Sequence, residues 1–344
     1  ARPLRSARAF AGDGRLMARV ISVVIPCYDA SATLEAAIRS ALDQDVAAEV
    51  IVIDDGSTDA SPGVIQSLGE RIRSERTLNR GASAARNRGT ELARGAFIQY
   101  LDADDVLLPG TLAARRSALE ASGADIACTD WRRLVATGAG EVLRPAIMRP
   151  DMAALAHDAE AATATADFWA PPAALMYRRR IVDAVGAWPG LQTCEDARFL
   201  FEVAARGARF VQVPGVGALY RMSPDSLSRR DRRQFIEDCA ANARDIEAHW
   251  RAGGALTGDR AHALARMWRH VASASLLGGF AAFEEAYEHH RAVAPRSYVL
   301  EAGRWMRDLL GPGHAASLLD WSRRHRHAVR RTMPAQMRHA LGWK

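Results

Sequence analysis

Three carboxylates at the end of an apolar run are the residues of this chain best suited to chemistry. Asp102, Asp104 and Asp105 follow residues 96–101, a run typical of a buried strand. Two aspartates separated by one residue supply hard oxygen ligands, which suit Mg²⁺ or Mn²⁺ bridging the phosphates of a nucleotide. The alternative is an acidic turn that is simply solvated, so the interpretation depends on the neighbouring residues.

Two more acidic sites stand at the ends of expected elements. Asp55 follows the apolar run 50–53 within Asp-Asp-Gly-Ser-Thr-Asp, a sequence that also suits a turn. Glu195 and Asp196 open a helix expected over 195–206, where acidic side chains interact favourably with the helix dipole. A carboxylate there could instead be the base that takes a proton from an attacking hydroxyl.

The elements that must position these groups alternate between strand and helix. The expected strands are residues 20–27, 50–53, 96–101 and 124–129, and the expected helices are 31–42 with Ser31 as its cap, one starting at Ser61, one ending at Arg94, and 109–121. This alternation predicts an α/β fold with a doubly wound, mostly parallel sheet. Because parallel strands end at one edge of a sheet, Asp55 and the loop after residue 101 are expected to share that edge.

The pattern becomes mixed after residue 131. Short strands are expected at 173–177, 209–213 and 216–221, and nearly everything from residue 231 onwards reads as helix. We therefore expect three regions, which are a disordered extension over 1–16, a catalytic domain over 17–230 and a helical C-terminal region over 231–344.

The composition excludes several classes of protein. The 344 residues are 49% hydrophobic and 25% charged, an ordinary globular balance. Four widely spaced cysteines without a Cys-x-x-Cys pair argue against a disulfide framework or a zinc site. The longest apolar stretch, 271–283, is shorter than the roughly 20 residues of a membrane-spanning helix. The N-terminus also lacks the apolar core of a signal peptide.

The net charge of +6 is concentrated in the tail. Residues 321–344 contain seven Lys or Arg and no Asp or Glu, whereas the rest of the chain is close to neutral, which disfavours nucleic-acid binding. Apolar residues recur every four positions in this tail, although Pro334 interrupts it. The segment either contacts an anionic membrane surface or forms the charged outer face of a packed helix.

Several motifs, taken in order, resemble the family 2 glycosyltransferases of the GT-A fold. They are Pro-Cys-Tyr-Asp at 26–29, Asp-Asp-Gly-Ser-Thr-Asp at 54–59, Asn-Arg-Gly-Ala-Ser-Ala-Ala-Arg-Asn-Arg-Gly at 79–89, Leu-Asp-Ala-Asp-Asp at 101–105, Cys-Glu-Asp at 194–196 and Tyr-Arg-Met-Ser at 220–223. The resemblance covers about residues 20–230. It implies a GT-A catalytic domain with a helical extension behind it.

The resemblance also implies a role for individual residues. Asp104 would bind the metal directly, and Asp102 would bind the ribose or complete the metal's surroundings. Asp196 would be the catalytic base. The other residues implied at the nucleotide-sugar are Pro26 and Tyr28 beside the base, Asp55 on the base or ribose, Arg86, Asn87, Ala103 within the Asp-Ala-Asp motif, and Arg229 on the diphosphate.

The implied activity is a metal-dependent, inverting transfer of a sugar from a nucleotide-diphospho-sugar, with a UDP-sugar favoured, to a glycan or lipid-linked acceptor. Mn²⁺ or Mg²⁺ would be the cofactor, and the enzyme would be cytoplasmic, at or near the inner face of the membrane. Many relatives have a histidine shortly after the Tyr-Arg pair, where this chain has Met222. The alternatives are a sugar nucleotidyltransferase, which usually has a glycine-rich loop after the first strand, and a non-catalytic nucleotide- or glycan-binding relative.

Overall fold

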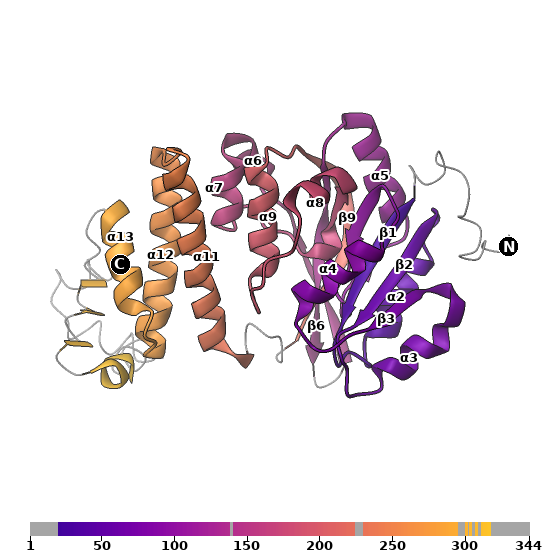
Figure 1. Ribbon diagram of the computed structural model, residues 1–344, viewed down its shortest axis with the longest axis horizontal. Coiled ribbons are helices and arrows are strands. Elements are labelled where there is room, and N and C mark those ends of the chain that lie inside the picture. Colours follow the sequence, from indigo (N-terminus) through magenta and orange to yellow (C-terminus); the bar gives the residue numbers. More distant parts are fainter. Residues whose placement is uncertain are drawn as a thin grey trace. The chain divides into compact units, whose positions relative to one another are not determined.

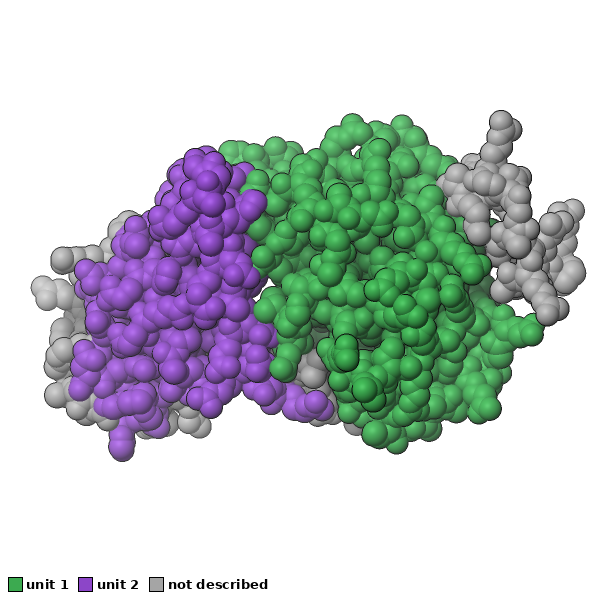
Figure 2. Space-filling view, in the orientation of Figure 1, with its two compact units in different colours: residues 1–226 green, residues 227–344 purple. Residues whose placement is uncertain are grey.

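The computed structural model describes residues 20–137, 140–223, 230–294, 300–301, 303–304, 307–308 and 311–317. The chain divides into two compact units, residues 1–226 and residues 227–344 (Figure 2). The expected extension over 1–16, the basic tail over 321–344 and Arg229 lie outside the described residues.

The first half of unit 1 is the predicted parallel sheet (Figure 1). Its strands, in spatial order, are β3 (Arg73–Arg76), β2 (Ala48–Asp54), β1 (Ile21–Cys27) and β4 (Phe97–Tyr100), joined by α2 (Leu34–Leu42), α3 (Ser61–Leu68) and α4 (Ala82–Leu92). All seven residues of β1 are buried, as expected for a strand with neighbours on both sides and helices over it. The α/β class is therefore confirmed.

The second half of the sheet is mixed rather than parallel. It contains β5 (Val106–Leu107), β6 (Ile126–Thr137), β7 (Gly140–Met148), β8 (Leu175–Arg178) and β9 (Phe210–Met222). β8 runs antiparallel between β4 and β6, β9 runs parallel to β6, and β5 and β7 pair antiparallel with β9 and β6. The remaining helices of this unit are α5 (Thr111–Ser122), α6 (Met152–His157), α7 (Ala159–Ala164), α8 (Arg179–Val185) and α9 (Glu195–Ala205).

Two expected strand boundaries and one expected cap were wrong. The strands expected at 209–213 and 216–221 are one strand, because Pro214 and Gly215 form a bulge where the register with β6 shifts. The strand expected at 124–129 continues to Thr137, through a segment in which polar and apolar residues do not alternate regularly. α2 begins at Leu34 with Thr33 at its N-cap, while the backbone N–H of Ser31 donates to Asp59 instead.

Helix α4 packs closely on the sheet, and this close packing determines how near its side chains lie to the strand ends. A Cβ atom at Gly89 would overlap Cγ1 of Val24 in β1, so only glycine permits this approach. Arg86 lies one turn earlier on the same helix, at the carboxyl end of β1 and β4. The glycine therefore brings the arginine down onto the edge of the sheet.

Unit 2 contains α11 (Arg232–Ala252), α12 (Gly258–Gly278) and α13 (Phe283–Val293). Trp250 of α11 and Trp268 of α12 are fully buried, so both contribute to the packing of these helices. No helix in the described part of the chain combines the length and apolar character needed to cross a bilayer.

Candidate active site

The two acidic loops lie at the same edge of the sheet, as the sequence predicted. Asp55 follows β2 and Asp102 follows β4, and these parallel strands flank β1. In an open α/β sheet, the carboxyl ends of such strands are where ligands bind. Asp55, Asp102 and the residues around them are therefore placed to act on one ligand.

Arg86 joins the loop after β4 to the start of α9. Its Nη2 lies 2.6 Å from Oδ1 of Asp102, and its Nη1 lies 2.9 Å from Oε1 of Glu195. The side chain is 3% exposed, and its guanidinium carbon stands 4.4 Å from the ring centre of Trp188. Burial alone would lower the pKa of Arg86, but the charges of Asp102 and Glu195 outweigh burial and raise it, so the cation is permanent.

Asn87 fastens the segment before α9 to α4. Its Nδ2 donates to the Trp188 carbonyl at 3.3 Å, and the Trp188 N–H donates to its Oδ1 at 2.7 Å. The Trp188 ring stacks on Phe199 of α9 with centres 4.1 Å apart. In this structure the Asn87 side chain therefore positions protein backbone, and its expected contact with the nucleotide-sugar stays a prediction.

Asp196 is half-buried and adjoins Glu195 in the first turn of α9, with both carboxylate oxygens accepting hydrogen bonds. The indole N–H of Trp169 donates to Oδ2 at 2.9 Å, and the N–H of Ala197 donates to Oδ1 at 2.8 Å. Burial raises the pKa of Asp196, although the two hydrogen bonds and Arg86 oppose the rise. The pKa of Glu195 is also raised, mainly by burial, against the opposing charge of Arg86.

An aromatic cluster supports the Trp169 side of Asp196. Trp169 makes edge-to-face contacts with Trp131 of β6 at 5.9 Å and with Tyr220 of β9 at 5.6 Å. The role of Trp188 was missed, and its only signal was the Gly-Ala-Trp-Pro sequence shortly before the Cys-Glu-Asp motif.

The Asp-Ala-Asp-Asp loop is dense in negative charge. Burial, followed by the charge of Asp102, raises the pKa of Asp104 to about 6. Burial and both neighbouring aspartates raise the pKa of Asp105 well above its usual value. Asp105 accepts the N–H of Arg221 at 2.8 Å through Oδ1, while its buried Oδ2 has no hydrogen-bond partner. Arg221 also donates to the carbonyl oxygen of Asp104.

This loop fits a divalent cation by its chemistry. Asp102 and Asp104 provide hard oxygen donors in a cluster whose mutual repulsion a cation would relieve. Within the described residues, no three His, Cys, Asp or Glu side chains converge as a ready-made metal cage. Mg²⁺ commonly uses only one or two carboxylates together with substrate phosphates, so the pair suits a cation that arrives with a nucleotide.

The Asp55 carboxylate is occupied by the loop that precedes α4. It accepts hydrogen bonds from the N–H groups of Arg80 and Gly81, at 3.1 and 2.7 Å, and from the Thr77 hydroxyl at 3.2 Å. Asp55 also lines a cavity of about 320 Å³ together with Leu78 and other residues of this loop. The carboxylate thus shapes the wall of a cavity of nucleoside size, while its expected contact with the ligand stays a prediction.

The first strand contributes the remaining predicted donor residues. Pro26 lies within β1, opposite Ile53 of β2, and Tyr28 is 48% exposed just beyond the strand. The next residue, Asp29, has a φ of 46° and accepts the N–H of Thr58 at 2.6 Å, which joins this turn to the loop after β2. Tyr28 is therefore held on a fixed turn with its ring open to solvent.

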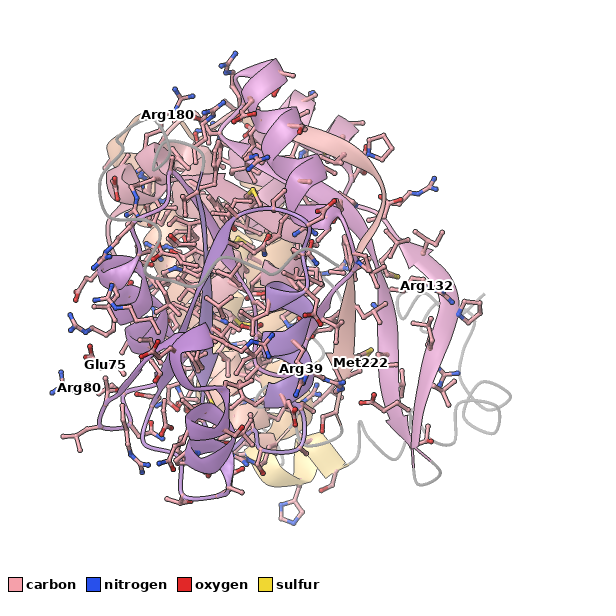
Figure 3. The ribbon with its side chains drawn as sticks, turned by 90° about the vertical axis from the view of Figure 1, so that its right-hand side faces the viewer. Arg39, Glu75, Arg80, Arg132, Arg180 and Met222 are labelled. Carbon is pink, nitrogen blue, oxygen red and sulfur yellow. The ribbon has the colours of Figure 1, made fainter. Side chains whose placement is uncertain are left out.

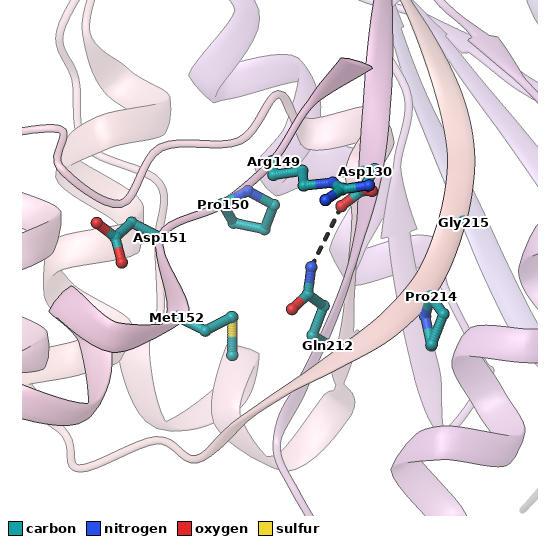
Figure 4. Close-up of a pocket in the computed structure, with 8 residues that line it drawn as sticks. All are labelled: Asp130, Arg149, Pro150, Asp151, Met152, Gln212, Pro214 and Gly215. Atoms are coloured by element: carbon teal, nitrogen blue, oxygen red, sulfur yellow. Dashed lines mark hydrogen bonds and ion pairs between the residues drawn. The ribbon is translucent and has the colours of Figure 1, made fainter.

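A second cavity lies apart from these carboxylates. It has a volume of about 400 Å³ and is lined by Asp130, Arg149, Pro150, Asp151, Met152, Gln212, Pro214 and Gly215 (Figure 4). The Asp130 carboxylate is already bound by Arg149 at 3.0 Å and by Gln212 at 3.2 Å. None of the predicted site residues lines it.

Comparisons with known proteins agree with this fold. Residues 22–182 match the family model described as Glycosyl transferase family 2. Succinoglycan biosynthesis protein ExoO of Rhizobium meliloti is 39% identical over 110 residues, which are 31% of this chain and 32% of that protein. A Campylobacter jejuni GalNAc(5)-diNAcBac-PP-undecaprenol beta-1,3-glucosyltransferase is 37% identical over 98 residues, 27% of this chain and 32% of that protein. The chain thus spans about a third of these curated relatives.

Solved structures share the fold over most of the chain. Residues 1–349 of S. aureus TarS in complex with UDP-GlcNAc give a TM-score of 0.60 at 16% identity, covering 88% of this chain and 91% of that one. The same protein in complex with UDP gives a TM-score of 0.57 at 18% identity, with the same coverage. At these identities the likeness establishes the fold, which is the predicted GT-A arrangement.

Proposed function

We propose that this chain, whose residues 22–182 match the model of glycosyl transferase family 2, is a glycosyltransferase that moves a sugar from a nucleotide-diphospho-sugar to a hydroxyl of a glycan or lipid-linked acceptor. A UDP-sugar is the favoured donor, and a hexosyl or N-acetylhexosaminyl group the favoured cargo. The proposal includes a cytoplasmic location at or near the inner face of the membrane.

The observation that carries the proposal is the bridge formed by Arg86. It brings the loop that would hold the donor diphosphate, through Asp102, beside the helix start that would hold the base, through Glu195. These groups come from distant parts of the sequence and meet at the carboxyl edge of the sheet, with Arg86 buried and both carboxylates half-buried. Burying so many carboxylates costs free energy, which is typical of a functional site.

The proposed reaction is a single displacement. The acceptor hydroxyl attacks the anomeric carbon and forms the new C–O bond as the bond to the diphosphate oxygen breaks. The nucleoside diphosphate leaves with that electron pair, and Asp196 takes the hydroxyl proton. Attack on the face opposite the leaving group inverts the anomeric centre. The raised pKa of Asp196 makes it a stronger base than an exposed aspartate.

The chain's own residues supply the positioning. Trp169 and Ala197 hold the Asp196 carboxylate by hydrogen bonds, and Arg86 prevents Asp102 and Glu195 from repelling each other. Asp104 and Asp102 would hold Mg²⁺ or Mn²⁺, which when bound stabilises negative charge on a diphosphate leaving group.

The known ligands and acceptor of similar proteins support the choice of substrate classes. TarS has been solved with UDP and with UDP-GlcNAc, and the C. jejuni relative is named for an undecaprenol-linked glycan acceptor. We extend these classes to this chain as part of the proposal.

The test is transfer and donor hydrolysis over a panel of nucleotide-sugars with Mn²⁺. Asp196→Asn should lower the rate by about 10²–10⁴-fold while nucleotide binding persists, because only proton removal is lost. Asp104→Asn should lose about 10²-fold or more in rate and also weaken nucleotide binding in Mn²⁺. Equal nucleotide release from the wild type and both variants would contradict the proposal.

A further inference from the structure

The β6–β7 hairpin, taken here as residues 131–137 and 140–148, exposes apolar side chains to an unusual degree. All residues of β7 from Gly140 to Ile147 are exposed. Large exposed apolar side chains in the described part of the chain are few, and three of them lie on this strand: Val142, Leu143 and Ile147, at 46%, 40% and 48%. A concentration of this kind marks an interaction surface.

The strand register places apolar residues on both faces of the hairpin. Leu143 pairs with Leu134, and Ile147 pairs with Arg132 on the same face. Val142 pairs with Val135 on the opposite face. Figure 3, in which Arg132 is labelled, shows these strands at the margin of the sheet. Both faces of the outer half of the hairpin therefore carry apolar side chains.

The charge of the hairpin is strongly positive. It carries Arg132, Arg133 and Arg144, and its acidic residue in the described range, Glu141, is paired with Arg221. Arg133 and Arg144 are exposed and form no ion pair with another described residue. The hairpin thus combines apolar side chains with arginines whose charge is unbalanced, and its complement is an anionic surface with an apolar layer beneath it.

The edge of β7 is poorly suited to pairing with another strand. The register with β6 shifts between Arg132 and Leu134, so residues 144–146 bulge outward. Pro145 in this bulge has no N–H to donate, which is a common way to block edge-to-edge pairing. A second copy of the chain would also bring like charges together. These features favour a lipid surface over a strand-paired dimer.

We propose that the β6–β7 hairpin binds the surface of an anionic lipid bilayer. Leu143 and Ile147 enter the boundary between headgroups and acyl chains, and Arg133 and Arg144 pair with lipid phosphates. This contact is separate from any contact by the basic tail. It does not rest on the proposed transferase activity, since it concerns binding alone.

The test is flotation of the full chain with phosphatidylcholine vesicles, with and without phosphatidylglycerol. The wild type should float with the anionic vesicles and should not float with the neutral ones. Replacing Arg133 and Arg144 by Gln should weaken binding by about 30-fold, from about fivefold for each arginine near an anionic surface. Leu143→Ser with Ile147→Ser should weaken it by at least about tenfold, because two half-exposed side chains no longer become buried.

Matched controls keep the result specific to the hairpin. Arg71→Gln with Arg94→Gln removes two exposed arginines elsewhere in unit 1 and should leave flotation unchanged, as should Leu78→Ser for an exposed apolar residue. Thermal unfolding of each variant checks that it is folded. If the hairpin variants float as well as the wild type, the proposal is overturned.

A site-specific probe separates the hairpin from the tail, which all variants retain. An environment-sensitive fluorophore on Ala146→Cys, an exposed position of β7, should shift to the blue on anionic vesicles. Wild-type protein treated in the same way gives the background, because its described cysteines are buried or half-buried. Flotation without a shift would assign binding to another surface.

Loss of a dimer in the Leu143→Ser/Ile147→Ser variant, measured by light scattering, would assign the hairpin to a second copy instead. Either result overturns the proposal.

Discussion

A carboxylate base must be ionised when the acceptor hydroxyl attacks, and its surroundings set the pH at which that happens. Burial raises the pKa of Asp196, so the transfer rate should begin to fall, as pH decreases, at a higher pH than for an exposed aspartate. The hydrogen bond from Trp169 stabilises the charged form and limits this rise. Trp169 thus both positions the Asp196 carboxylate and limits the rise of its pKa.

Trp169→Phe should therefore raise the pKa of Asp196 further. Losing a hydrogen bond to a charged group, worth about 1.5–3 kcal/mol, should move the acid limb of the pH–rate profile upward by about one unit or more. Trp131→Phe is the matched control, since its buried indole nitrogen lacks a hydrogen-bond partner in the same aromatic cluster. A profile that moves equally in both variants would assign the effect to packing instead.

Arg86 shows how far a single side chain can be understood from its position in a motif. The family resemblance implied a place for Arg86 at the nucleotide-sugar, and the structure shows its guanidinium bound to two carboxylates. Arg86→Met should cost up to about 3 kcal/mol of unfolding free energy, because it leaves two half-buried carboxylates without their counter-charge. Urea unfolding measures this, and Arg94→Met is an exposed control in the same region. A loss no larger than that of the control would show that the bridge does not stabilise the fold.

At the level of elements, α4 and the segment before α9 are joined by Asn87. Asn87→Ala should destabilise the protein by about 1–3 kcal/mol, because the N–H and carbonyl of Trp188 lose their partner. If Trp188 then moves, Arg86 loses its aromatic support and the transfer rate falls with it. Unfolding and activity measured on the same variant test this, and a stable but inactive variant would place Asn87 on the ligand instead.

The sequence predicted some elements well and others poorly, for identifiable reasons. The strands β1, β2 and β4 are almost entirely buried, so their apolar runs were unmistakable, and their parallel order brought Asp55 and Asp102 to one edge. β7 and the outer half of β6 were missed because exposed strands carry no such pattern. The bridge from Arg86 to Glu195 joins residues far apart in the chain, and local patterns hold no information about such pairs.

For the whole molecule, a ligand that binds only the folded state must raise its stability. UDP with Mn²⁺ should raise the melting temperature, and at 100 times the dissociation constant the gain is about 2.7 kcal/mol. Asp104→Asn should lose most of the part that depends on Mn²⁺. The two units of the chain need not respond together, so the shift should be read on a signal from unit 1. No shift with any nucleotide would contradict the proposed donor class.

Arg221 of β9 connects the acidic loop to the β6–β7 hairpin. The same side chain that donates to the carbonyl of Asp104 is paired with Glu141 of the β6–β7 hairpin. Donor binding at Asp104 and membrane binding at the hairpin would then both affect Arg221. Linkage requires reciprocity: if the surface tightens donor binding by some factor, the donor tightens surface binding by the same factor. A loaded enzyme would then stay longer where its acceptor is found, and an empty one would leave.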